Sequence, residues 1–71
     1  MFSIALTHAD HTRNYRVSPS ENFGWDLTLT EDRQATRQVH YEDWHRVERA
    51  LAALELEVRA LTAQGWHVVI Q

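Results

Sequence analysis

The sequence contains no cysteine and no lysine, and it has only two glycines and one proline. Without cysteine the chain has neither a disulfide nor a thiolate ligand for a metal ion. Two common catalytic nucleophiles, the thiolate and the lysine amine, are therefore missing. Gly24 and Gly65 stand alone, so no glycine-rich loop is present to hold a phosphate group.

Long hydrophobic runs are also missing. No apolar stretch approaches the roughly 20 residues that a membrane-spanning helix needs. The N-terminal sequence MFSIALTHAD lacks the basic region of a signal peptide. We therefore expect no membrane association and a cytoplasmic location.

Basic charge is in deficit, with seven basic and ten acidic residues and a net charge of −3 when histidine is neutral. This balance disfavours nonspecific binding to DNA, RNA or anionic membranes. The 71 residues predict a single domain over 1–71. A chain this short has barely enough hydrophobic core, which makes self-association or a permanent partner a serious expectation.

The first half of the chain, about residues 2–41, alternates apolar and polar residues as β-strands do. Strands are expected at about 2–8, 13–18, 23–30 and 34–41. In the third of these, the alternation predicts one apolar face made of Phe23, Trp25, Leu27 and Leu29.

The strand expected at 34–41 has one charged residue on its otherwise apolar face. Ala35, Val39 and Tyr41 share one face by period-2 spacing, and Arg37 lies among them. An edge position in the sheet would let the Arg37 head reach water while its stem packs.

From about residue 43 the spacing becomes helical, and we expect a helix over 43–64. Asp43 is the predicted N-cap, and Gly65 supplies the C′ position, with Trp66 packing back in a Schellman motif. Apolar residues spaced three and four apart make one continuous stripe: Trp44, Val47, Leu51, Leu54, Val58 and Leu61.

The expected fold class is therefore α+β: a small antiparallel β-sheet of three or four strands with one long α-helix packed on one face. Residues 66–70 form either a short C-terminal strand or an extended tail on the sheet.

No catalytic residue, metal site or cofactor is predicted, so we expect no enzyme. Serine occurs only at positions 3, 18 and 20, outside any nucleophile motif. His8, Asp10 and His11 cluster in an expected turn without a standard zinc spacing. The three tryptophans have evident core roles, but one that proved exposed would become the first candidate for a partner contact.

A second row runs along the helix beside the apolar stripe and is the predicted partner-binding surface. Small side chains with one leucine would let another helix approach closely, and a two-fold homodimer is one expected form. The row consists of Arg49, Ala53, Leu56, Ala60 and Ala63.

By elimination, the expected function is a non-catalytic, small, acidic protein-interaction module with a protein partner. One concrete form is a phage- or mobile-element-encoded inhibitor of anti-CRISPR type that blocks a larger partner. The alternative is a regulator that binds nucleic acid through arginines interleaved with aromatic residues in the sheet half. Its candidate residues are Arg13, Arg16, Arg33 and Arg37. No family motif can be identified in the sequence.

Overall fold

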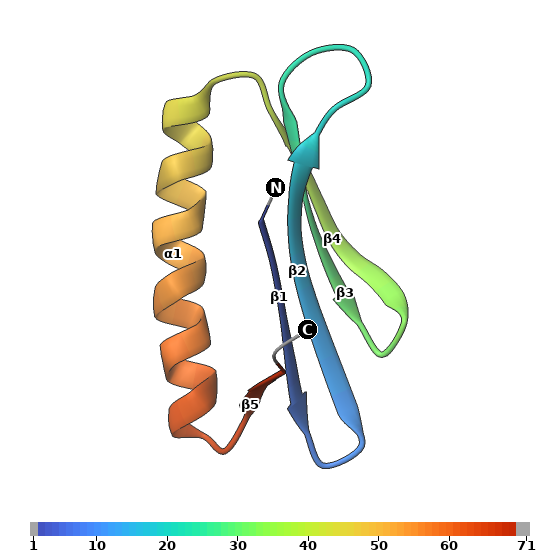
Figure 1. Ribbon diagram of the computed structural model, residues 1–71, viewed down its shortest axis with the longest axis vertical. Helices are drawn as coiled ribbons and strands as arrows, with labels where there is room; N and C mark the ends of the chain where they lie inside the picture. The colour runs from blue at the N-terminus through green and yellow to red at the C-terminus, as the bar shows by residue number, and fades with distance from the viewer. Residues whose placement is uncertain (1, 70–71) are drawn as a thin grey trace.

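In the computed structural model, which describes residues 2–69, the chain forms a five-stranded antiparallel sheet and one α-helix (Figure 1). The strands lie side by side in the order β4-β3-β2-β1-β5. The predicted α+β class is confirmed, and the sheet has five strands rather than three or four because the C-terminal segment pairs with β1. The elements are β1 (Phe2–His8), β2 (His11–Pro19), β3 (Trp25–Glu31), β4 (Gln34–Tyr41), α1 (Trp44–Ala63) and β5 (His67–Val69).

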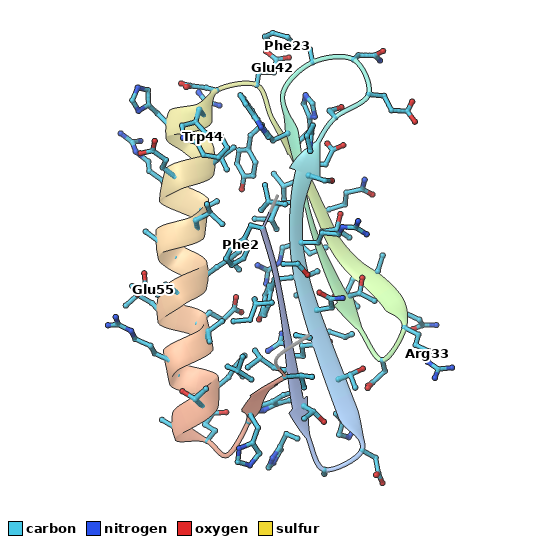
Figure 2. All side chains as sticks on the ribbon, in the orientation of Figure 1. Phe2, Phe23, Arg33, Glu42, Trp44 and Glu55 are labelled. Atoms are coloured by element: carbon cyan, nitrogen blue, oxygen red, sulfur yellow. The ribbon has the colours of Figure 1, made fainter. Side chains whose placement is uncertain are left out.

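Two-residue turns connect β1 to β2 and β3 to β4. Between β3 and β4, Asp32 and Arg33 have φ values of 50° and 72°. Positive φ at both central residues is the geometry of a type I′ turn, whose twist matches that of the flanking strands. Arg33 is therefore at the tip of a hairpin, at the opposite end of the sheet from Phe23 (Figure 2).

The hydrophobic core fills the space between α1 and one face of the sheet (Figure 1). Along α1 the seven-residue spacing of Val47, Leu54 and Leu61 points all three toward the sheet, where they are buried. Leu51 and Val58 lie on one flank of that line and are half-buried. The strands contribute Leu6, Tyr15, Val17, Leu27 and Leu29 to the buried core.

Both predicted helix caps are confirmed, within one residue of the predicted bounds. The Asp43 carboxylate accepts a hydrogen bond from the backbone N–H of His45 at 3.0 Å. At the other end, the Trp66 N–H donates to the Leu61 carbonyl and the Gly65 N–H to that of Thr62, which is the Schellman pattern. Within residues 2–69 no helix is both long and apolar enough to cross a membrane.

The prediction that Phe23 lies on the apolar strand face is wrong. β3 begins only at Trp25, and Phe23 belongs to the loop that precedes it, with 64% of its surface exposed. Gly24 ends the alternation because its φ is 85° and a Cβ there would collide with the backbone oxygen of Tyr41.

The face predicted for β4 is also wrong at one position. A β-bulge shifts the register, so that Arg37 pairs with Leu29 whereas Ala35 pairs with Thr30 on the opposite face. Ala35 is accordingly exposed. The edge position expected for Arg37 is confirmed, because β4 is the outermost strand on its side of the sheet.

Candidate protein-interaction site

The outer face of α1, turned away from the sheet, carries the predicted partner-binding row. All five of its residues, Arg49, Ala53, Leu56, Ala60 and Ala63, are exposed. Leu56 is two residues beyond the buried Leu54, a rotation of about 200°, and 66% of its surface is in contact with solvent. The structure thus brings the row together as a continuous surface with an apolar centre.

An apolar groove of about 460 Å³ lies along one flank of α1, between the helix and β1. Phe2 and Ile4 of β1 form one wall, and Leu51 and Val58 of α1 form the other. Ala52 also lines the groove, and it is one helical turn before Leu56. The groove and the exposed row therefore adjoin, and together they form more apolar surface than Leu56 provides alone.

Charged side chains also belong to this surface, because Glu48 and Glu55 of α1 line the groove beside its apolar residues. Arg59 donates a hydrogen bond to Glu55 at 2.9 Å, and both side chains are largely exposed. Figure 2 shows Glu55 on the side of α1 that faces away from the strands. An exposed pair of this kind contributes little to stability. Such charges favour register in an interface more than they favour affinity.

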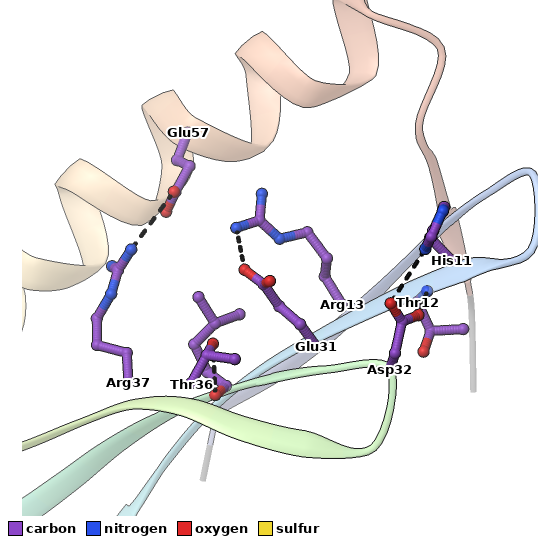
Figure 3. A network of polar contacts seen from close by, with 9 residues as sticks. His11, Thr12, Arg13, Glu31, Asp32, Thr36, Arg37 and Glu57 are labelled. Carbon is purple, nitrogen blue, oxygen red and sulfur yellow. Dashed lines mark hydrogen bonds and ion pairs between the residues drawn. The ribbon is translucent and has the colours of Figure 1, made fainter.

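The four arginines of the nucleic-acid alternative are divided between the two faces of the sheet and a turn. Arg13 and Arg37 extend toward α1, where they meet Glu31 at 2.7 Å and Glu57 at 3.8 Å (Figure 3). Arg16 alternates with Tyr15 and Val17 and so lies on the uncovered face, while Arg33 is in the β3–β4 turn. The structure does not bring the four together.

Beneath α1, Arg13 and the buried Tyr15 form a semi-buried polar cluster that the sequence reasoning missed. Only 18% of the Arg13 side chain is exposed, and its guanidinium carbon is 5.8 Å from the ring centres of both Tyr15 and Trp66. Burial raises the pKa of Tyr15, with the negative charge of Glu57 acting in the same direction. The sequence did contain a sign of this cluster. Arg13, Tyr15 and Val17 are spaced two residues apart, so a strand places all three on the same face.

The histidines of the predicted turn cluster have separate partners. The ring of His8 lies 3.2 Å from the carbonyl oxygen of Gly65, and His11 Nδ1 is 3.0 Å from Asp32. In the described residues, no group of three or more histidines and carboxylates is placed to hold a metal ion.

The His11–Asp32 contact links the start of β2 to the β3–β4 turn. Its hydrogen bond and charge raise the pKa of His11 above the ordinary 6.5. The hydrogen bond from His11, followed by one from the Thr12 N–H, lowers the pKa of Asp32 below 3.8. The stabilisation from His11 is full below pH 6.5 and is lost as pH rises through the folded pKa. The stabilisation from Asp32 is full above pH 3.8 and is lost as pH falls through its folded pKa.

We therefore expect the contact to contribute most between about pH 4 and 6.5. Thermal melts of the wild type and His11→Gln should differ most within this window and converge above about pH 8, because His11 is then neutral. His67→Gln is the control, since His67 is exposed in β5 and no carboxylate is paired with it in the described part of the chain, and it should follow the wild type. A constant gap between wild type and His11→Gln from pH 5 to 8 would contradict the assignment.

No protein-family model, curated protein sequence or solved structure matches this chain.

Proposed function

We propose that this protein is a non-catalytic interaction module that acts in the cytoplasm and binds a protein partner through the outer face of α1. The exposure of Leu56 at the centre of the row carries the proposal. The neighbouring alanines present little bulk, so a second helix can approach closely and surround the leucine. The expected partner includes a second copy of the chain, because a two-fold contact would place both Leu56 side chains in one interface.

The energetics favour an interface larger than the row alone. Burial of one leucine contributes about 1.5–3 kcal/mol, which is less than the cost of bringing two molecules together. A two-fold interface counts this contribution twice. The groove beside Ala52 adds the half-buried apolar surfaces of Leu51 and Val58. We therefore expect the partner to cover both the row and the groove.

The variant Leu56→Glu tests this surface. It places a charge at the centre of the contact and leaves the buried stripe untouched, so we expect a folded monomer. Light scattering on the wild type at about 100 μM should give the mass of a dimer, since this concentration is far above even a micromolar Kd. Ala35→Glu is the matched control, because it adds the same charge at an exposed position on the sheet face away from α1, and it should leave the mass unchanged.

A monomeric wild type would contradict self-association and assign the row to a different protein. Pull-downs from the native host with wild type and Leu56→Glu then test the row itself. Loss of a specific protein with Leu56→Glu would support the proposal. Recovery of the same proteins by both would contradict it.

The inhibitor of anti-CRISPR type remains a narrower form of the same proposal. Such an inhibitor would use acidic groups to cover a nucleic-acid-binding surface of its partner. Within residues 2–69, five of the ten carboxylates are in ion pairs: Asp26, Glu31, Asp32, Glu55 and Glu57. An acidic surface would therefore depend on the other five, most of which lie near the start of α1.

The nucleic-acid alternative depends mainly on Arg16 and Arg33, because Arg13 and Arg37 are paired with carboxylates. Binding of labelled DNA and RNA at about 50 and 200 mM salt tests it. Phosphate-driven binding weakens steeply between these concentrations, and no binding at the lower one would set this alternative aside.

A further inference from the structure

Two aromatic side chains are exposed at the end of the molecule where α1 begins. Phe23 is 64% exposed and Trp44 is 39% exposed. Figure 2 shows both at this end, and the backbone of Glu42 lies against Gly24, the residue after Phe23. Trp44 also packs edge-on against Trp25, with ring centres 5.1 Å apart, so its exposed part belongs to an anchored ring. This end therefore presents aromatic surface that the core does not use.

The loop that carries Phe23 is held in place by its own backbone. The Ser20 N–H donates a hydrogen bond to the Gly24 carbonyl at 2.9 Å, which closes the loop between β2 and β3. Gly24 packs so closely against the backbone of Tyr41 and Glu42 that no side chain fits there. The backbone at Phe23 is therefore held in one conformation. Less conformational entropy is lost when a partner covers this side chain than if the loop were free to move.

Carboxylates without ion pairs gather at the same end. Glu21 is in the loop, Glu42 precedes α1, and Glu48 follows one turn into the helix; none of the three is in an ion pair within the described residues. Asp43 adds a fourth negative charge while it caps the helix. Arg46 and His45 are basic side chains in the first turn of α1, and His40 is paired with Asp26 at 2.8 Å. The local charge is therefore negative at neutral pH.

We propose that this aromatic and acidic end, defined by Phe23, Trp44, Glu21 and Glu42, binds a basic segment of a protein partner. An arginine or lysine stacks on an exposed aromatic ring while its charge meets a carboxylate. Charge complementarity selects this occupant, because nucleic acid and anionic lipid are repelled by the same carboxylates. The surface is separate from the outer face of α1, so it extends the proposed function and does not depend on it.

Titration with a short peptide of alternating arginine and serine tests the proposal, with amide and indole chemical shifts as the readout. We expect shifts at Gly24, Glu42 and the indole N–H of Trp44. A matched peptide with citrulline in place of arginine keeps the shape and removes the charge, and it should not bind. Phe23→Ala should weaken binding about fivefold, and Glu42→Gln by a smaller factor.

Asp10→Asn is the matched control for Glu42→Gln, because it removes the same charge in the β1–β2 turn at the opposite end of the molecule (Figure 1), and it should leave peptide affinity unchanged. Phe23 is outside the core, so Phe23→Ala should fold, and circular dichroism checks this. Equal affinity of wild type and Phe23→Ala would overturn the proposal. Equal binding of the citrulline peptide would overturn it as well. So would amide chemical-shift changes of similar size at all the acidic residues of α1.

Discussion

Leu54→Ala is expected to lower the free energy of unfolding by about 2–5 kcal/mol. Leu54 is 4% exposed and lies at the centre of the buried helix stripe. It also lines both flanking grooves, the one toward β1 and the one toward β4, so its side chain separates them. Truncation removes the central contact of α1 with the sheet. A chain of this length has a total stability of only about 4–11 kcal/mol, so the loss is a large fraction of it.

Urea denaturation measures the effect at a protein concentration where light scattering gives the mass of a monomer, and Leu56→Ala then provides the matched control. The same atoms are removed one half-turn away, where the side chain is 66% exposed. Alanine is also the better helix former, so the control should change stability by less than about 0.5 kcal/mol. Similar losses for the two variants would mean that α1 is not oriented on the sheet as described.

The helix was predictable because its signals are local and agree with one another. The three-and-four spacing gave the buried line of Val47, Leu54 and Leu61, and the caps at Asp43 and Gly65 follow from chemistry within a few residues. The exposure of Leu56 follows from the same periodicity. The residues of the candidate row are exposed on the outer face of α1, while their role in binding a partner stays a prediction.

The errors occur where the backbone departs from regular alternation. Phe23 continues the period-2 pattern of β3 in sequence, yet the positive φ of Gly24 separates it from the strand. Ala35 has the spacing of Val39 and Tyr41, but the bulge moves it to the other face. Side-chain hydrophobicity does not encode either event. Gly24, which interrupts the alternating pattern, was the one local sign that Phe23 would lie outside the strand.

The roles of the arginines depended on long-range pairing, which composition does not show. Arg13 and Arg16 are three residues apart, so a strand places them on opposite faces. Only the β2–β3 register shows that Arg13 is directly opposite Glu31. What looked like two equivalent basic residues of a hairpin is one structural arginine and one exposed arginine.

Arg13→Ala is expected to lower the free energy of unfolding by about 1.5–3 kcal/mol, the range for a hydrogen bond between charged groups in a poorly hydrated position. The variant leaves Glu31 without its partner and removes the guanidinium that lies near the rings of Tyr15 and Trp66. Arg16→Ala, on the uncovered face, should change stability by less than about 0.5 kcal/mol. Urea denaturation compares the two.

Arg13→Met separates the contribution of packing from that of charge. Methionine fills the space of the arginine stem and lacks the Nε of Arg13, which is buried and has no hydrogen-bond partner among the described residues. We therefore expect Arg13→Met to be more stable than Arg13→Ala, even though both lose the contact with Glu31. If Arg13→Ala were as harmless as Arg16→Ala, the side chain would be free to act at the surface, and the nucleic-acid alternative would regain one of its four arginines.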